Sequence, residues 1–254
     1  MTDAIDLNAD LGEGFGAWRM GDDAGLLTIV TSANVACGFH AGDPSHMART
    51  FAAAKQAGVR VGTHVGYPDL QGFGRRAMAL TPQEIEDATL YQIGAAQALA
   101  ARAGVRIAYV KAHGALANRA EIDADAADAL ARAAQAAGDL PLLAIALSEQ
   151  VAAGRRLGLH VFHEIFADRA YTDEGRLAPR SSPGAVITDA KEAAARTRAM
   201  LVEGALITTS GQRLPTPIDS ICVHGDSPHA LVMARALRGA LEVAGLRIAA
   251  FVGP

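Results

Sequence analysis

The chain has 254 residues, of which 50% are hydrophobic and 5% aromatic, and its formal net charge is -4 at pH 7. This length suits one α/β barrel domain, and the mixed charges exclude the clustered basic surface that nucleic acids and anionic membranes require. The opening MTDAIDLNAD lacks a signal-peptide pattern, and no apolar run reaches the roughly 20 residues that span a bilayer. We therefore expect a cytoplasmic protein with a single domain over residues 1–254.

Short apolar runs alternate with longer alanine-rich segments along the chain. The apolar runs predict strands at Ile5–Asp10, Ala33–Phe39, Val59–His64, Arg106–Ala112, Leu140–Ala146, His160–Phe166, Ser220–His224 and Leu246–Phe251. The longer segments predict helices at Pro44–Ala57, Pro82–Ala103, Ile122–Ala137, Ser148–Leu157, Asp189–Val202 and Pro228–Ala244. Repeated strand–helix–strand units indicate a parallel sheet, and both a closed barrel and an open doubly wound sheet fit this order.

Two long loops and a hairpin interrupt the alternation. Gly66–Ala79 and Ala167–Ala185 follow strands and contain arginines and aromatic residues, which is typical of lids or binding loops. Leu206–Ile218 indicates a small hairpin around Ser210-Gly211. Cys37 and Cys222 lie within apolar runs, so we expect buried thiols and no disulfide.

Four predicted strands end on a histidine that is followed within two residues by glycine. These histidines are His40, His64, His113 and His224. One such histidine is most often a hydrogen-bonded core residue, whereas four at equivalent positions are hard to explain by packing. Because the carboxyl ends of parallel strands converge, the pattern predicts one shared site.

The two-residue period of the strands points further polar groups into the same interior. Asp6, Asn8 and Asp10 alternate with apolar residues, and Lys111, His113 and Glu164 take comparable positions on later strands. Buried charges must pair, so these groups form a coupled network. A purely structural ion-pair layer explains Asp6 and Lys111 equally well. Asp43 and Asp226 precede predicted helices, and each is either an N-cap or part of the chemistry.

Several kinds of chemistry fit these residues. Carboxylates and histidines at one barrel mouth can bind a divalent metal or act as general base and acid. No His-Glu-x-x-His motif is present, and a Schiff base on Lys111 is a rival interpretation. Arg75 and Arg76 in one long loop, and Arg169 and Arg180 in the other, can clamp a carboxylate or a phosphate.

Six blocks of sequence resemble the LamB/YcsF family: IDLNADLGEGFG, ANVACGFHAGDP, THVGYPDLQGFGRR, VKAHGALAN, FADRAYTDEGRLAPRSSPGAVI and ICVHGDSP. The chain departs from the family pattern at Val65, Ala112 and Ala117, none of which removes an ionisable group. The resemblance implies an irregular barrel of about seven parallel strands, similar to the glycoside hydrolase/deacetylase superfamily. It also implies opening of the 5-oxoproline (pyroglutamate) lactam to L-glutamate with ATP hydrolysis, by a 5-oxoprolinase that includes subunits B and C.

On this resemblance we assign roles. The expected catalytic residues are Asp10 or Glu164 as the base, His113 and His224 as acid–base or carbonyl-polarising groups, and Lys111 as a stabiliser of negative charge. The expected substrate-binding residues are Asn8, His40, His64, Arg75, Asp168, Arg169, Arg180 and Asp226, and Asn8, His40 and His64 are alternatively metal ligands. The sequence lacks a Walker loop, so ATP, with Mg²⁺, would contact the arginine loops or the partner subunits.

Two other functions fit the same residues. One is a stand-alone metal-dependent deacetylase or amidase, which needs bound metal and no ATP. The other is a non-catalytic subunit that binds a lactam or a sugar and would keep its affinity without Asp10 and Glu164. Self-association is left open by the sequence.

Overall fold

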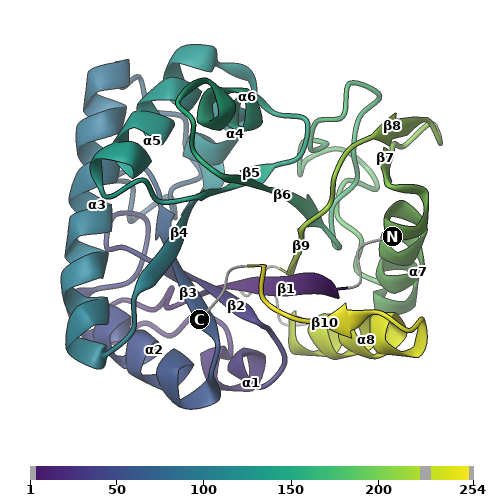
Figure 1. Ribbon diagram of the computed structural model, residues 1–254, viewed down its shortest axis with the longest axis horizontal. Coiled ribbons are helices and arrows are strands. Elements are labelled where there is room, and N and C mark those ends of the chain that lie inside the picture. The colour runs from purple at the N-terminus through teal and green to yellow at the C-terminus, as the bar shows by residue number, and fades with distance from the viewer. Residues whose placement is uncertain (1–3, 224–229, 252–254) are drawn as a thin grey trace.

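Parallel strands close into a barrel, as Figure 1 shows. The structure is a computed structural model that describes residues 4–223 and 230–251. Within these ranges the barrel strands are β1 (Ala4–Leu11), β2 (Ser32–Ala36), β3 (Arg60–Val65), β4 (Ile107–Ala112), β5 (Leu142–Ile145), β6 (Val161–Phe166) and β9 (Ser220–Val223). Neighbours in this order pair in parallel, and β9 pairs back onto β1 with Asp6 opposite Ser220. The predicted barrel of seven strands is confirmed, and the open sheet is excluded.

Helices surround the barrel on the outside (Figure 1). They are α1 (Asp23–Leu27), α2 (Pro44–Ala57), α3 (Pro82–Ala103), α4 (Gly114–Ile122), α5 (Ala124–Ala136), α6 (Glu149–Arg156), α7 (Ala190–Glu203) and α8 (Ala230–Val243). None of these described helices combines the length and the apolar character that a membrane span needs. The start of the helix predicted at Pro228–Ala244 lies outside the described residues.

Side-chain caps account for the helices that the sequence placed best. Asp43 accepts hydrogen bonds from the backbone amides of Ser45 and His46, and proline follows it at the first helical position. Thr81 and Glu84 form a reciprocal capping box at the start of α3. Asp43 is therefore a helix cap, which resolves one of the two ambiguous acids.

Three predicted elements differ from the structure. The strand predicted at Ala33–Phe39 ends at Ala36, because the chain turns at Gly38, which has a φ of 98° and donates its amide to the Ala41 carbonyl. The helix predicted at Ile122–Ala137 begins two residues later, as α5 at Ala124, because the Asp123 side chain caps it, and the separate helix α4 before it was not predicted. The strand predicted at Leu246–Phe251 is only β10 (Arg247–Ile248), which pairs with β1 beside the closed ring.

The predicted hairpin is confirmed, and both cysteines are buried and free. β7 (Ala205–Ile207) and β8 (Arg213–Pro215) pair in antiparallel fashion. The thiols of Cys37 and Cys222 are buried without a disulfide, and burial raises the pKa of both. The last residue of the strand predicted at Ser220–His224 lies outside the described residues.

Polar and aromatic side chains fill the half of the barrel interior that lies toward the amino ends of the strands, which we call the lower half. The Asp6 carboxylate accepts hydrogen bonds from the hydroxyls of Thr31 and Ser32, both at 2.6 Å, and from Ser220. Aromatic rings fill the space beside this layer and form what we call the aromatic floor: Tyr109, Phe162 and Phe251, with centroids 4.3–5.0 Å apart. Glycine at position 62 leaves room for the Tyr109 ring, since a Cβ there would lie 2.3 Å from it.

An amide ladder links this layer to the upper half of the barrel. The Asn8 amide donates to Ser220 at 2.7 Å and to Glu164 at 2.9 Å, and its oxygen accepts from Asn34 at 2.6 Å. Tyr109 donates its hydroxyl to Asn34 at 2.8 Å. The polar face of β1 therefore points inward as predicted, and its hydrogen bonds hold neighbouring strands in register.

We expect Asp6 to make the stability of the fold depend on pH. Burial raises the pKa of Asp6 from 3.8 to about 6, although the surrounding hydroxyls lower it. A carboxyl with a raised folded-state pKa contributes stability below its unfolded pKa and loses that contribution as the pH rises through about 6. Between pH 5 and 7.5 the wild type should therefore lose about 1 kcal/mol of unfolding free energy relative to Asp6→Asn. Urea titrations at the two pH values measure this difference.

The control for this experiment is Asp87→Asn, at an exposed position of α3. Its difference from the wild type should stay constant over the same pH interval. An Asp6→Asn difference that also stays constant would contradict the prediction.

Candidate active site

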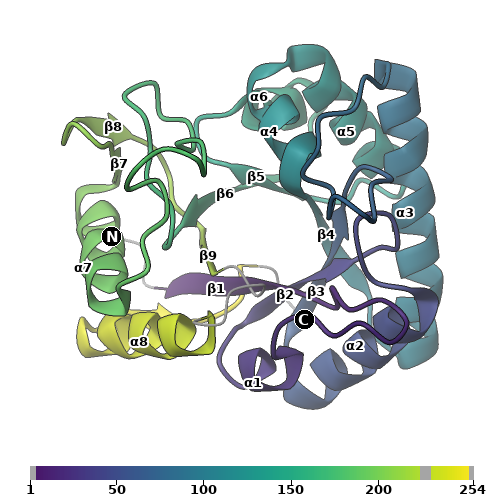
Figure 2. The same cartoon turned by 180° about the vertical axis from the view of Figure 1, so that it is seen from behind.

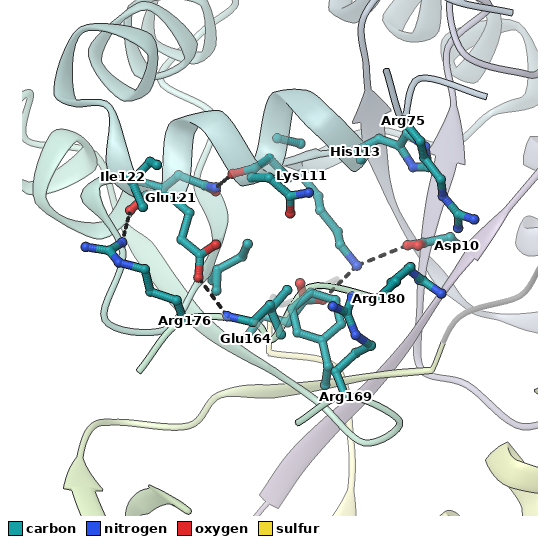
Figure 3. A pocket seen from close by; sticks show the side chains of 18 of the residues that line it. Asp10, Arg75, Lys111, His113, Glu121, Ile122, Glu164, Arg169, Arg176 and Arg180 are labelled. Atoms are coloured by element: carbon teal, nitrogen blue, oxygen red, sulfur yellow. Dashed lines mark hydrogen bonds and ion pairs between the residues drawn. The ribbon is translucent and has the colours of Figure 1, made fainter. Parts of the chain in front are cut away.

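A cavity of about 470 Å³ opens at the carboxyl ends of the strands. Eight of the predicted residues line it: Asp10, His64, Arg75, Lys111, His113, Glu164, Arg169 and Arg180. Figure 2 shows the barrel from the side on which the loops after the strands lie, and Figure 3 shows the cavity from close by. The convergence inferred from the strand ends is therefore found in the structure.

A buried ion triad lies at the base of the cavity. The ammonium of Lys111 lies 3.0 Å from an Asp10 oxygen and 2.8 Å from a Glu164 oxygen, and all three side chains are buried. Figure 3 shows the Lys111 side chain extending across the cavity to both carboxylates. Burial lowers the pKa of Lys111, but the charges of Asp10 and Glu164 outweigh this, and the net pKa lies well above its usual value. A charged ammonium does not favour a Schiff base, which requires a free amine.

Glu164 differs from Asp10 in its environment. Burial raises the pKa of Glu164, although the Lys111 charge lowers it. One oxygen of this carboxyl accepts from Asn8, while the other is buried without a hydrogen-bond partner among the described residues. A buried carboxyl of this kind can hold a proton at higher pH than a surface carboxyl, as a general acid or base requires.

Three histidines and Glu13 form a second cluster beside the triad. One ligand atom from each of Glu13, His40, His64 and His113 lies within 4.8 Å of the others, and all four residues are buried. His64 also connects the two groups, since its Nε2 lies 3.3 Å from Asp10. The cluster is a candidate metal-binding site within the described part of the chain.

The loop after β3 orients His113. The Nε2–H of His113 donates to the Phe73 carbonyl at 2.8 Å. Phe73 has a φ of 54°, a left-handed conformation that is uncommon for a bulky residue and that costs about 1–3 kcal/mol. Gly74 follows with a φ of 63°, and a Cβ there would lie 2.6 Å from His40. The loop therefore packs directly on two of the histidines.

Two side chains hold this loop in place. The Gln92 side chain from α3 binds both the amide and the carbonyl of Gly66, at 2.9 and 3.0 Å. The Asp69 carboxylate accepts from the Gly72 amide at 3.0 Å and from the Arg76 guanidinium. Arg76 is thus occupied with Asp69 and does not line the cavity, in contrast to Arg75.

The loop after β6 covers the other side of the cavity. Arg169 is buried and donates to the Ala178 and Ala185 carbonyls of its own loop. Burial lowers the pKa of Arg169, and the charge of Arg180 lowers it further. Glu121 at the end of α4 accepts from the Leu177 amide at 3.1 Å and so ties the loop to the barrel. This long segment is an ordered cover of the cavity.

The other predicted residues have different positions. Asn8 lies below the triad in the amide ladder, and His40 lies in the histidine cluster. Asp168 is buried next to Arg169 but does not line the cavity. His224 and Asp226 lie outside the described residues.

The sequence analysis missed Glu13, Glu121 and Arg176. Glu13 follows the end of β1 after Gly12, which has a φ of 72°, so strand periodicity cannot place it. Its position between two glycines directly after a strand rich in acids was the available signal. Glu121 and Arg176 approach the cavity from α4 and the second loop, and α4 itself was not predicted.

Comparisons with known proteins agree with this geometry. The model of the LamB/YcsF family matches residues 5–253. A protein of Gluconobacter oxydans (strain 621H), named as the A subunit of 5-oxoprolinase, is 56% identical over 247 residues, which are 97% of each chain. The crystal structure of a lactam utilization protein from Thermus thermophilus is 44% identical, with a TM-score of 0.92 over 97% of this chain and 99% of that one. A deacetylase, T48, at 14% identity and a TM-score of 0.50 over 98% of this chain and 88% of that one, shares the fold alone.

We expect the contribution of the ion triad to stability to depend on the Lys111 ammonium. In Lys111→Met, two buried carboxylates lose their cation, and the free energy of unfolding at pH 7.5 should fall by about 3–5 kcal/mol. The loss should shrink at pH 5.5, because one carboxyl can then take up a proton. Chemical denaturation at both pH values measures the effect.

The matched control is Lys191→Met at an exposed position of α7, which should change the unfolding free energy by no more than about 0.5 kcal/mol. If Lys111→Met were as mild as the control, the triad would not hold the upper barrel together.

Proposed function

The chain belongs to the LamB/YcsF family, and on that premise we propose that it is the A subunit of a 5-oxoprolinase. The proposed reaction opens the lactam of 5-oxo-L-proline to L-glutamate with hydrolysis of ATP, and the proposed partners are subunits B and C. The observation that carries the proposal is the buried Asp10–Lys111–Glu164 triad at the base of an arginine-lined cavity. The relative with 56% identity, which carries the 5-oxoprolinase name, supports the substrate.

The arginines suit the negative charges of the reactants. Arg75, Arg169 and Arg180 line the cavity, and Figure 3 shows Arg169 and Arg180 across from Lys111. Guanidinium groups bind carboxylates and phosphates through paired hydrogen bonds, so they can hold the substrate carboxylate or a phosphoryl group of ATP. We assign Mg²⁺ to the phosphates, as in other phosphoryl-transfer sites. Nucleotide contacts beyond these arginines would come from the partner subunits.

ATP makes the ring opening feasible because a lactam carbonyl is a poor electrophile. The lactam oxygen takes the γ-phosphoryl group and ADP leaves, which gives a phosphorylated imidate. Water then adds to the ring carbon, the carbon–nitrogen bond breaks, and the ring nitrogen takes a proton, which leaves γ-glutamyl phosphate. A second water hydrolyses this acyl phosphate, so one ATP and two waters yield glutamate, ADP and phosphate.

The residues of the cavity have distinct tasks in these steps. Asp10 or Glu164 would take the proton from the attacking water, and Lys111 would stabilise negative charge on the substrate oxygen. His113 would polarise the carbonyl or transfer a proton, together with His224. The remaining residues, which would orient the substrate or its direct contacts, are Asn8, His40, His64, Asp168 and Asp226.

A metal-dependent amidase that acts without ATP is the second candidate. The observation that favours it is the cluster of Glu13 with three histidines, since these donors would hold a metal ion and such an ion would supply the activation of water. The isolated chain would then hydrolyse an amide without nucleotide, whereas the first function requires ATP and the partner subunits.

The first test replaces the proposed base. In the assembled complex, Asp10→Asn should reduce ATP-dependent glutamate formation by about 10²–10⁴-fold, because the variant cannot accept the proton of water. Glutamate and phosphate are both measured, with Asp87→Asn as the surface control. Near-normal turnover of a folded Asp10→Asn complex would remove Asp10 from this role.

The second test addresses the anion site. Arg180→Ala should raise the KM for 5-oxoproline or for ATP by about 10–100-fold, the loss expected for one charged hydrogen bond. Arg198→Ala, at an exposed position of α7, should leave both KM values unchanged. Equal KM values in both variants would mean that the Arg180 side chain does not contact the reactants.

A further inference from the structure

We propose that Glu13, His40, His64 and His113 bind one divalent transition-metal ion of the zinc type. His64 and His113 line the cavity of the proposed lactam site, and as metal ligands they would hold the ion in place of the substrate-binding and acid–base roles given above. Metal binding itself needs neither 5-oxoproline nor ATP. Three imidazoles and one carboxylate are a donor set typical of bound zinc and related ions. The four residues come from the segments after β1, β2 and β4 and from β3 itself, so the barrel fold brings them together.

The donor atoms are already close to one another. His113 Nδ1 lies 3.0 Å from His64 Nε2 and 3.8 Å from Glu13 Oε1, and His40 Nε2 lies 3.5 Å from the same Glu13 oxygen. Ligand bonds of about 2.0–2.1 Å in a tetrahedral site place ligand atoms roughly 3.4 Å apart. Each of these three separations therefore needs to change by less than about half an ångström.

His113 is oriented as a metal ligand. Because the Phe73 carbonyl can only accept a hydrogen bond, His113 Nε2 must carry the proton. The lone pair of the neutral ring is then on Nδ1, which faces His64 and Glu13. Metal-binding histidines commonly donate their second ring nitrogen to a backbone carbonyl in this way.

His40 gives the second, independent indication. Its side chain has no exposed surface, and neither ring nitrogen has a hydrogen-bond partner among the described residues. A buried polar group that is left without a hydrogen bond destabilises the folded protein. Coordination by Nε2, which points toward Glu13, would remove part of this cost.

The kind of donor atom also decides which ion suits the cluster. Nitrogen donors favour zinc, cobalt or nickel over Mg²⁺ and Ca²⁺, which prefer an all-oxygen shell.

One ring must turn when the ion binds. The rings of His40 and His113 stack with centroids 3.8 Å apart and an angle of 6° between them, so their lone pairs lie in separate, nearly parallel planes and do not both point at one ion. His64 lies at 87° to both rings. Rotation of His40 within the loop that follows β2 would complete the set of four ligands.

A hydrogen bond between His64 and His113 is the alternative to a bound metal ion. His64 Nε2 can donate a hydrogen bond to His113 Nδ1 across the 3.0 Å contact, which would satisfy this pair without any ion. In the first arrangement the His113 Nδ1 lone pair accepts a hydrogen bond, and in the second it binds the metal. Metal-binding measurements distinguish the two.

The experiment uses the full-length chain after chelator treatment and dialysis. Titration with Co²⁺ should give one equivalent bound, with the visible absorption of a four- or five-coordinate ion, and Zn²⁺ should displace it while excess Mg²⁺ should not. X-ray absorption of the Zn²⁺-loaded protein should show three imidazole nitrogens and one carboxylate oxygen at about 2.0–2.2 Å. The metal should also raise the melting temperature by mass action.

Matched variants locate the ion. Glu13→Gln and His64→Gln should each weaken Co²⁺ binding by more than about tenfold, since even outer-shell changes weaken metal binding by about 10–100-fold. His160→Gln, at an exposed position before β6, should bind like the wild type. Circular dichroism and thermal melts show whether each variant is folded, and the absorption measurement on the wild type remains decisive if one is not.

The proposal is overturned if the folded wild type binds no Co²⁺ or Zn²⁺ at micromolar concentrations. It is also overturned if binding survives in both folded ligand variants, or if X-ray absorption shows only oxygen ligands. Because no step uses 5-oxoproline, ATP or a partner protein, a failed lactamase assay leaves this result unaffected, and the reverse also holds.

Discussion

The charge of Lys111 is the constraint on which the interior of this protein depends. Asp10 and Glu164 approach the same ammonium from different strands, at 3.0 and 2.8 Å, and all three side chains are buried. Leaving either carboxylate without its cation would be costly, so the strands that carry them must stay closed around it. The amide ladder through Asn8 and Asn34 carries the same constraint downward to the Asp6 layer. The network that closes the barrel therefore also contains the residues to which we assign the proposed reaction.

The loops provide what the strands cannot. Strand ends fix the directions of Asp10 and Lys111, but the histidine cluster depends on backbone conformations such as that of Phe73, which are unfavourable by themselves. Gln92 and Asp69 hold the first long loop in the conformation that presents the Phe73 carbonyl to His113. On the other side, Glu121 and α7 hold the segment that carries Arg169. Because these contacts hold both loops in place, the entropic cost of ordering them when a substrate binds is reduced.

The sequence predicted the parts of this arrangement that follow from periodicity. Alternation in β1 placed Asp6, Asn8 and Asp10 inside the barrel, and proline after a capping residue placed the starts of α2 and α3. It failed where the chain leaves regular structure: the strand predicted to reach Phe39 ends at Ala36, so His40 joins the cluster from a turn, and Glu13, which follows a glycine with positive φ, was missed. Contacts such as that between His64 and His113 connect residues 49 apart and arise only when the barrel closes. Family resemblance, and not local pattern, pointed to the reaction.

The aromatic floor determines by which route a ligand can enter and leave the barrel. Tyr109, Phe162 and Phe251 pack together within the lower barrel, beside the satisfied Asp6 layer, while the cavity opens at the other end. Over the part of the chain that the structure describes, the barrel interior is therefore a pocket that opens at the carboxyl ends of the strands, and aromatic side chains fill its other end. A ligand that enters past the arginines would leave by the same opening. A protein bound over that opening would control both the entry and the exit of ligands. It would therefore set the order in which reactants bind and products dissociate.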